Sequence, residues 1–278
     1  MRNFFRDKNM KKNSLSGDVR AKKHLGQHFL KDEYIAEQIV GLLAIGKDAP
    51  YDQVLEVGPG MGVLTKYLIP KIATNVVEID VESVAYLQRH FPDLQERIWH
   101  KDFLTADWPS LLGDQAFALI GNFPYNISSP IFFRVLELRD QIPEVVGMLQ
   151  KEVAERIAAP AGSRASGILS VFLQTFYEVS YCFTVPPEVF DPPPKVQSGV
   201  VRLLRNERKV LPCSEKMFRR VVKQAFHTRR KTLRNALKSW QLSENLTSQA
   251  IFDKRAEQLN VEDFLYLTQQ IETSLQQP

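Results

Sequence analysis

The strongest constraint on how this chain folds is a series of short apolar runs separated by longer segments of helical character. The runs are QVLEVG, VVEID, FALIGN and VVGMLQ, which begin at residues 53, 76, 117 and 145. A short, continuous apolar run of this kind is typical of a parallel strand that is buried on both faces. Strands that alternate with helices are joined by right-handed crossovers. The pattern therefore predicts an α/β fold with a mainly parallel, doubly wound sheet.

The rest of the chain divides near residues 20 and 205. Two later segments, 170–185 and 198–205, fit further strands that run antiparallel to the others, although their patterns also fit a helix. Beyond residue 205 the pattern is helical, and one apolar stripe consists of Met217, Phe218, Val221, Val222, Ala225 and Phe226. We expect a flexible basic arm (1–20), an α/β domain (21–205) and a small all-helical domain (206–278).

Composition limits the class of protein. In the 278 residues, 44% are hydrophobic and 24% are charged, which is ordinary for a globular protein. No apolar stretch approaches the length of a membrane span, and the N-terminus lacks the apolar core of a secretory signal. Cys182 and Cys213 are too few for a disulfide framework or a zinc site. We expect a cytoplasmic protein with no membrane anchor and no metal.

Positive charge gathers in two segments. Residues 1–31 hold nine basic side chains against two acidic ones, and residues 202–238 hold thirteen against two, although the net charge of the chain is only +4. Two basic segments on an acidic body suggest a polyanionic partner. The alternative is an ordinary surface with solvated lysines and arginines.

A glycine cluster follows the first apolar run. VLEVGPGMGVLT (54–65) places Gly58, Gly60 and Gly62 where the backbone must turn sharply and approach a ligand closely. The spacing favours a nucleotide, but Val63 stands where the dinucleotide fingerprint needs its third glycine. A tight strand-to-helix turn without a ligand is the alternative.

Two acidic residues extend the nucleotide hypothesis. Glu78 ends the second apolar run, and a carboxylate there can accept hydrogen bonds from both ribose hydroxyls of a nucleoside. Asp102 follows RIWHK and can accept a hydrogen bond from an adenine amino group, although a role as a surface cap is also open for it. These residues fit NAD and S-adenosylmethionine equally well.

The segment GNFPYNISSPI (121–131) discriminates between the two cofactors. Asn-x-Pro-Tyr looks like the motif of amino-methyltransferases. The Asn122 side-chain oxygen and the Phe123 carbonyl can accept the two protons of an adenine amino group and localise its lone pair. Pro124 restricts the backbone, and Tyr125 can stack on an extruded base. The alternative is a turn with a buried aromatic.

With these motifs the chain resembles the ribosomal RNA adenine dimethyltransferases, and especially the bacterial small-subunit (16S) type. Four further segments carry the resemblance: HLGQHFL (24–30), LQKEVAERI (149–157), VPPEVFDPPPKVQS (185–198) and FHTRRKTLRNAL (226–237). The resemblance implies a Rossmann-like class I methyltransferase fold with S-adenosylmethionine as cofactor. By that resemblance, residues 21–205 form the methyltransferase domain and residues 206–278 bind RNA.

The resemblance also implies site residues. The cofactor contacts fall on His28, Leu30, Gly58, Gly60, Glu78, Asp102 and Asn122. This chain departs from the usual pattern twice, with His28 in place of Asn and Phe123 in place of Leu. Phe190 corresponds to the aromatic that the family places opposite the motif tyrosine, so we expect a base sandwich between Tyr125 and Phe190, with a core phenylalanine as the alternative. The basic residues implied to face RNA are Arg229, Arg230, Lys231 and Arg234, although such a helix could instead be solvated or bind an acidic protein.

The implied substrate is a pair of adjacent adenosines near the 3′ end of small-subunit rRNA in an assembling 30S particle, and the implied product is dimethyladenosine. We expect a monomer with a role in small-subunit maturation. Three alternatives remain: a large-subunit rRNA adenine methylase of the macrolide-resistance type, a ribosome-assembly factor with secondary catalysis, and a nicotinamide oxidoreductase. The last leaves NFPY and both basic segments unexplained.

Overall fold

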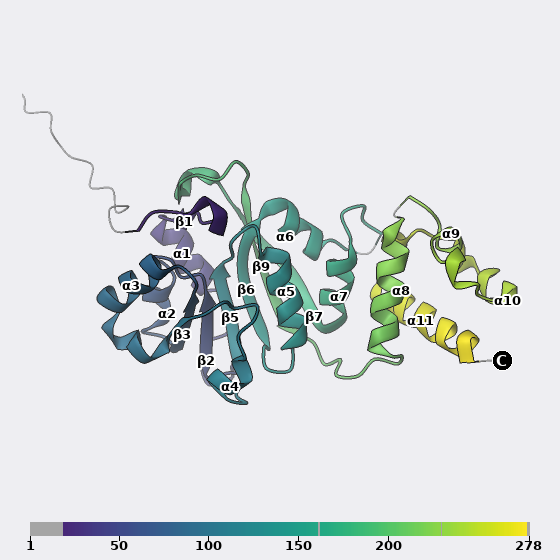
Figure 1. Ribbon diagram of the computed structural model, residues 1–278, viewed down its shortest axis with the longest axis horizontal. Helices are drawn as coiled ribbons and strands as arrows, with labels where there is room; N and C mark the ends of the chain where they lie inside the picture. The colour runs from purple at the N-terminus through teal and green to yellow at the C-terminus, as the bar shows by residue number, and fades with distance from the viewer. Residues whose placement is uncertain (1–18, 161, 229, 277–278) are drawn as a thin grey trace, which may run out of the picture.

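A seven-stranded sheet forms the centre of the computed structural model (Figure 1). Five neighbouring strands are parallel, β9 runs antiparallel to β6, and β7 pairs antiparallel with β9. In sheet order the strands are β4 (Ile98–His100), β3 (Ala73–Glu78), β2 (Gln53–Val57), β5 (Phe117–Asn122), β6 (Glu144–Gln150), β9 (Ser198–Arg205) and β7 (Tyr177–Val185). The predicted, mainly parallel sheet is confirmed.

The structure describes residues 19–160, 162–228 and 230–276. Most of the predicted basic arm and Arg229 lie outside the described residues. A short ribbon separate from the main sheet joins the segment after the arm to the loop before β9: β1 (Phe29–Leu30) pairs antiparallel with β8 (Phe190–Asp191). This pairing brings the two ends of the α/β part together over one edge of the sheet.

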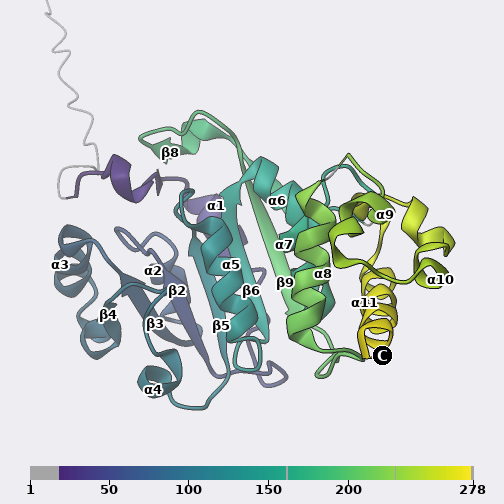
Figure 2. The same cartoon turned by 45° about the vertical axis from the view of Figure 1, so that its right-hand side comes forward.

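Helices cover both faces of the sheet (Figures 1 and 2). Side chains along a strand alternate between the faces, so Leu55 packs in one apolar cluster and Val54 in another. The first face carries α4 (Trp108–Leu112), α5 (Ser128–Glu137), α6 (Lys151–Ala158) and α7 (Ile168–Phe176). The second face carries α1 (Glu33–Val40), α2 (Thr65–Leu68) and α3 (Val81–His90). This arrangement is the doubly wound, Rossmann-like fold.

The ambiguous segment 170–185 contains both a helix and a strand. Helix α7 ends at Phe176 and β7 begins at the next residue, Tyr177. The helical half is buried on most sides between α5, α6 and the later helices. Its apolar run therefore lacks the one-sided period that would identify it from sequence.

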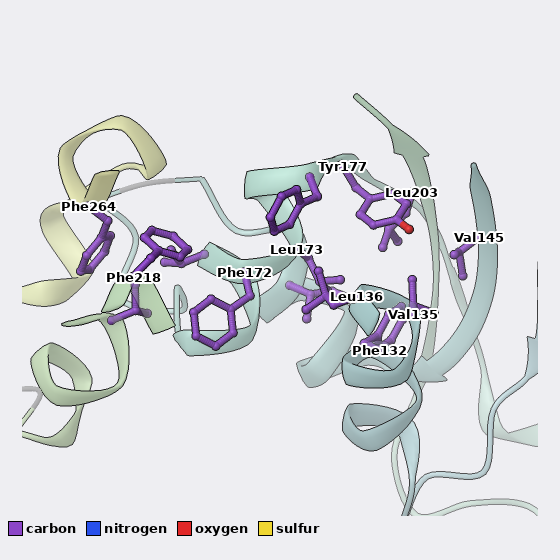
Figure 3. Close-up of a cluster of buried hydrophobic side chains, with 14 of the residues drawn as sticks. Phe132, Val135, Leu136, Val145, Phe172, Leu173, Tyr177, Leu203, Phe218 and Phe264 are labelled. Atoms are coloured by element: carbon purple, nitrogen blue, oxygen red, sulfur yellow. The ribbon is translucent and has the colours of Figure 1, made fainter. Parts of the chain in front are cut away.

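The C-terminal residues are helical, as predicted. The helices are α8 (Glu215–His227), α9 (Leu233–Ala236), α10 (Glu244–Thr247) and α11 (Val261–Gln276). In α8 the predicted stripe is buried from Phe218 to Phe226, and Met217 is partly buried. Figure 3 shows that Phe218 and Phe264 continue the same apolar cluster as Phe172 of α7. The division into two domains at residue 205 stays a prediction, because this cluster runs across it.

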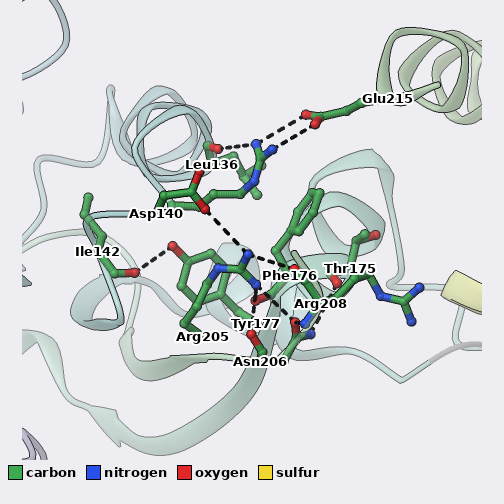
Figure 4. Close-up of polar contacts among 11 residues, drawn as sticks. Leu136, Asp140, Ile142, Thr175, Phe176, Tyr177, Arg205, Asn206, Arg208 and Glu215 are labelled. Carbon is green, nitrogen blue, oxygen red and sulfur yellow. Dashed lines mark hydrogen bonds and ion pairs between the residues drawn. The ribbon is translucent and has the colours of Figure 1, made fainter. Parts of the chain in front are cut away.

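Charged side chains join the turn after α5 to the start of α8 (Figure 4). Both terminal nitrogens of Arg139 bond to the Glu215 carboxylate, at 3.3 and 2.9 Å, and its guanidinium lies 4.3 Å from the centre of the Phe176 ring. Bidentate pairs of this type fix orientation as well as distance. The bond therefore sets how the C-terminal helices sit against the sheet layer.

Two further findings concern the part of the chain that the structure describes. It contains no helix that is both long and apolar enough to cross a membrane. It also contains no group of three or more His, Cys, Asp or Glu side chains placed to hold a metal ion.

Candidate active site

A cavity of about 150 Å³ opens at the carboxyl ends of β2 and β3, where ligands bind in sheets of this kind. Four of the predicted cofactor contacts line it: Gly58, Gly60, Glu78 and Asp102. The remaining lining comes from the N-terminal segment, the end of β3, the turn after β4 and the segment after β5, with Leu25, Gln27, Phe29, Val57, Val77, Ile79, Lys101, Phe103, Leu104, Pro124, Asn126 and Ile127.

The glycine loop lets its backbone form one wall of this cavity. Gly58 and Gly60 have φ angles of 68° and 56°, which favour glycine over residues with a side chain. A Cβ atom at Gly60 would lie 2.8 Å from the Phe29 ring, so a side chain there would collide with the N-terminal segment. The loop and the segment above it are therefore fitted to each other around the cavity.

Glu78 is 5% exposed and is held by backbone donors. The amides of Ile79 and Asp80 both donate to its Oε1 at 2.9 Å, and the Gly60 amide donates to its Oε2 at 3.2 Å. Burial raises the pKa of this carboxyl, and the three backbone hydrogen bonds act in the opposite direction. The three donors fix the carboxylate and leave about one of its lone-pair sites, on Oε2, for a ligand.

Asp102 lies across the same cavity, in the turn after β4. Its Oδ1 accepts a hydrogen bond from the Leu104 amide at 2.9 Å. The turn-capping role that the sequence left open is therefore present in the structure. A carboxylate oxygen with further acceptor capacity still lines the cavity, so capping and ligand binding are compatible.

Asn122 is the last residue of β5 and Phe123 follows it, and each offers an oxygen that can accept a hydrogen bond. The Asn122 Nδ2 donates to the His28 carbonyl at 2.8 Å, and this bond determines which way the amide is turned. The Phe123 amide donates to the Met148 carbonyl at 2.9 Å. Among the described residues, neither Asn122 Oδ1 nor the Phe123 carbonyl oxygen accepts a hydrogen bond. Two adjacent acceptors are thus unengaged at the sheet edge.

The Phe123 ring fits against two glycines that face each other across β5 and β6. Gly121 pairs with Gly147, and a Cβ atom on either would lie within 3.0 Å of the ring. The ring is fully buried and also meets Phe132 of α5 edge-on, with 5.8 Å between ring centres. The two glycines therefore leave room for the Phe123 ring, and the buried ring restrains the Phe123 backbone.

Tyr125 and Phe190, the two predicted walls of a base sandwich, lie in different surroundings in this structure. Tyr125 is half-buried, and its hydroxyl hydrogen-bonds to Ser198 Oγ at 2.6 Å. Burial raises the pKa of the phenol. Phe190 is 1% exposed and packs in the apolar cluster of the second sheet face. The sandwich stays a prediction, and it would require the Phe190 ring to leave this cluster.

His28 and Leu30 belong to the segment over the cavity but do not line it. Leu30 is buried in the second apolar cluster. The His28 ring lies beside Tyr125, with 5.3 Å between ring centres, instead of facing Glu78. A cofactor contact from either residue therefore stays a prediction, and Gln27 and Phe29 of the same segment line the cavity.

Sequence reasoning missed Glu56, which is buried in β2 just before the glycine loop. Its Oε2 accepts a hydrogen bond from the Thr65 hydroxyl at 2.6 Å. Burial raises the pKa of Glu56 to about 8, the charge of Glu78 acts in the same direction, and the Thr65 hydroxyl opposes both. The sequence feature that could have identified Glu56 is an acidic residue within an otherwise apolar strand, where a buried charge is costly.

A groove of about 570 Å³ lies where α5, α6, α7 and α8 meet, and its lining includes Ser129, four residues beyond Tyr125 in the chain. Its floor is apolar, and its rim includes Arg156, Lys223 and His227. Of the predicted RNA-binding residues, Arg230 and Lys231 are exposed just beyond α8 and have no ion pair with described residues. Arg234 is also exposed, but it bonds to Asp253 at 2.6 Å, which braces α9.

Known proteins resemble this chain over nearly its whole length. The family "Ribosomal RNA adenine dimethylase" matches residues 19–273. The ribosomal RNA small subunit methyltransferase A of Flavobacterium johnsoniae is 58% identical over 255 residues, which cover 91% of this chain and 97% of that protein. The same-named protein of Cytophaga hutchinsonii is 58% identical over 252 residues, covering 90% and 96%.

Solved structures of two methyltransferases also resemble this chain. A dimethyladenosine transferase from Plasmodium falciparum has a TM-score of 0.73 at 25% identity, covering 89% of this chain and 98% of that chain. The 23S rRNA methyltransferase ErmE has a TM-score of 0.67 at 24% identity, covering 88% and 99%, and this likeness concerns the fold alone. The fold is therefore that of class I methyltransferases, and the match over residues 19–273 shows that the chain belongs to the ribosomal RNA adenine dimethylase family.

Proposed function

We propose that this enzyme methylates the exocyclic amino groups of two adjacent adenosines near the 3′ end of small-subunit (16S) rRNA and so produces dimethyladenosines. The protein is an S-adenosylmethionine-dependent rRNA adenine dimethyltransferase. The observation that carries the site assignment is the pair of unengaged acceptors, Asn122 Oδ1 and the Phe123 carbonyl oxygen. An adenine amino group has two protons to donate, one to each.

The cavity residues fit the cofactor. Glu78 has a buried, backbone-anchored carboxylate for a ribose diol, and Asp102 offers an acceptor for an adenine amino group across the same cavity. The side-chain-free loop at Gly58 and Gly60 leaves room for a ligand against the backbone. When bound, S-adenosylmethionine supplies a methyl group that is already activated on a sulfonium.

The residues of the NFPY segment bind the target adenine and polarise its amino group. The Asn122 oxygen and the Phe123 carbonyl draw the amino nitrogen toward a tetrahedral shape, which localises its lone pair. The Tyr125 ring offers a face for the extruded base. Because the methyl group is already activated, orientation is the main requirement, and no strong general base is needed.

RNA engagement is supported by position and charge. The lining of the groove includes Ser129, which is four residues beyond Tyr125 in the chain, and His227, which is three residues before Arg230. Phosphate contacts would supply most of the affinity, and unpaired adenines in a folded hairpin are the accessible targets. Specificity for the small subunit rests on the names of the 58% identical relatives, whereas ErmE shares the fold at 24% identity. We infer further that the substrate is an assembling 30S particle and that the enzyme acts as a cytoplasmic monomer.

The test is a methyl-acceptor assay with labelled S-adenosylmethionine. Undermethylated small subunits should accept label on two adjacent adenosines, and large subunits should not. Asn122→Ala should lower the single-turnover rate by roughly 100-fold, because a group that polarises the reacting nitrogen is lost. The same substitution at Asn245, exposed on distant α10, is the control. Label on large-subunit RNA would instead support the macrolide-resistance type, and binding without transfer would support an assembly factor.

A further inference from the structure

His28 lies on the catalytic side of the N-terminal segment. Its neighbours Gln27 and Phe29 line the cofactor cavity. A second, small cavity is bordered by His28 together with the whole NFPY segment, from Asn122 to Tyr125. The His28 ring is directed to Tyr125, with ring centres 5.3 Å apart and planes inclined by 34°. The residue therefore faces the place where the target base must be held.

Three separate contacts connect His28 to the catalytic segment and its surroundings. Its Nδ1 lies 2.7 Å from the Pro192 carbonyl oxygen, and since a carbonyl only accepts, Nδ1 carries the proton. Its own carbonyl accepts the Asn122 Nδ2 at 2.8 Å. Its ring packs on Tyr125. His28 thus links the end of β5 to Pro192 in the loop after β8, and Pro192 is 164 residues from His28 in the chain.

These contacts act on the groups that the proposed reaction needs. Because the Asn122 amide nitrogen is committed to the His28 carbonyl, Oδ1 is the atom left to accept from the substrate. Tyr125 is restrained at its hydroxyl by Ser198 and along its ring by His28. Fixed supports of this type determine whether a reacting group is held within productive geometry.

We propose that His28 is a positioning residue for methyl transfer, which holds the Tyr125 ring through its imidazole and secures its own backbone carbonyl against Asn122 through the bond to Pro192. The proposal deepens the proposed function and rests on it. The two side-chain roles are separable. An asparagine amide nitrogen lies as many bonds from Cα as Nδ1 of histidine, so Asn can keep the bond to Pro192 but has no ring for Tyr125.

The experiment compares His28→Asn, His28→Phe and His28→Ala with the wild-type enzyme on undermethylated small subunits. His28→Asn should lower the single-turnover rate by about three- to tenfold, the size expected for one aromatic contact. His28→Phe keeps a ring but loses the donor, and His28→Ala should be slower than either. Cofactor Kd, measured by calorimetry, should stay within about twofold in His28→Asn, because the side chain does not line the cofactor cavity.

A double-mutant cycle separates positioning from general stability. In a Tyr125→Ala background the effect of His28→Asn should disappear, since the ring then has no partner. An unchanged rate in His28→Asn, or an undiminished loss in the Tyr125→Ala background, would overturn the proposal. A rise in cofactor Kd that accounts for the whole rate loss would make His28 a cofactor ligand and would also overturn it. Failure of the wild-type enzyme to label small subunits would instead overturn the proposed function.

Discussion

At the scale of single residues, buried carboxyls are the most unusual feature beside the cofactor cavity. Glu56 is 1% exposed, and it accepts a hydrogen bond from the Thr65 hydroxyl but forms no ion pair with the described residues. A carboxyl in such surroundings favours the protonated form. Its pKa of about 8 therefore couples its proton to the folded state over a physiological range of pH.

We expect the free energy of unfolding to depend on pH because the folded and unfolded states differ in the protonation of Glu56. In the unfolded chain Glu56 ionises near its usual pKa of 4.5, whereas in the folded protein it keeps its proton up to about pH 8. Between these values the folded state binds more protons, so stability falls as pH rises, by roughly 3–5 kcal/mol for this group. Glu56→Gln removes the contribution, so its stability relative to wild type should increase from pH 5 to pH 8 in urea unfolding.

The control is Glu178→Gln, which makes the same change at an exposed glutamate of β7. The pH dependence assigned to Glu56 is the part of the Glu56→Gln curve that the Glu178→Gln curve does not share. If the curves of Glu56→Gln and wild type run parallel from pH 5 to pH 8, then Glu56 is ionised in the folded protein and burial does not govern its proton.

At the scale of elements, the carboxyl end of β5 depends on its neighbour β6. Gly121 and Gly147 face each other across the two strands, and the Phe123 ring fills the space above them. Strand pairing thus sets the position of the Phe123 backbone, whose carbonyl is a proposed acceptor. The usual Leu of the family would need less room here than the phenyl ring.

We predict that Gly147→Ala lowers the free energy of unfolding by about 1–3 kcal/mol, because the new Cβ would lie 2.4 Å from the Phe123 ring. Combining it with Phe123→Leu should recover part of the loss, so that the pair is strongly non-additive in a thermal or urea cycle. The control is Gly167→Ala, where the nearest atom would be 3.8 Å away. Additive effects of the two substitutions would mean that the ring moves aside freely.

At the scale of the whole molecule, the basic residues lie beside the junction of the sheet layer and the C-terminal helices. The groove rim and the chain beyond α8 bring Arg156, Lys223 and Arg230 to one region. The two hydrogen bonds from Arg139 to Glu215 hold the start of α8 against the segment that follows α5. A folded RNA could engage it while presenting a base to the NFPY segment.

Charge reversal tests this surface. Arg230→Glu combined with Lys231→Glu should weaken RNA binding strongly and should reduce the salt slope of log K by about one for each phosphate that is no longer neutralised. Cofactor affinity should not change, because neither residue lines the cofactor cavity. Lys71→Glu with Arg89→Glu, exposed near the helices of the opposite sheet face, is the matched control. Equal losses of affinity in both pairs would indicate a general effect of net charge.

The sequence by itself determined the elements and the order of the site residues along the chain. Apolar runs buried on both faces mark parallel strands, and the carboxyl ends of such strands share one edge, so Gly58, Glu78 and Asp102 had to converge. The apolar stripe of α8 could also be predicted, because a helical period is visible within the helix's own sequence. The boundary between α7 and β7 could not be predicted, because α7 is buried on several sides and its sequence therefore lacks a helical period.

Only the tertiary structure decided which way individual side chains face. The pairing of β1 with β8 joins Phe29 to Asp191, and this long-range register places Phe190 in the core and the His28 ring beside Tyr125. The bond of Arg234 to Asp253 likewise depends on how α9 packs. A one-residue change of register turns every side chain of a strand to the other face, and no local pattern in a two-residue strand specifies that register.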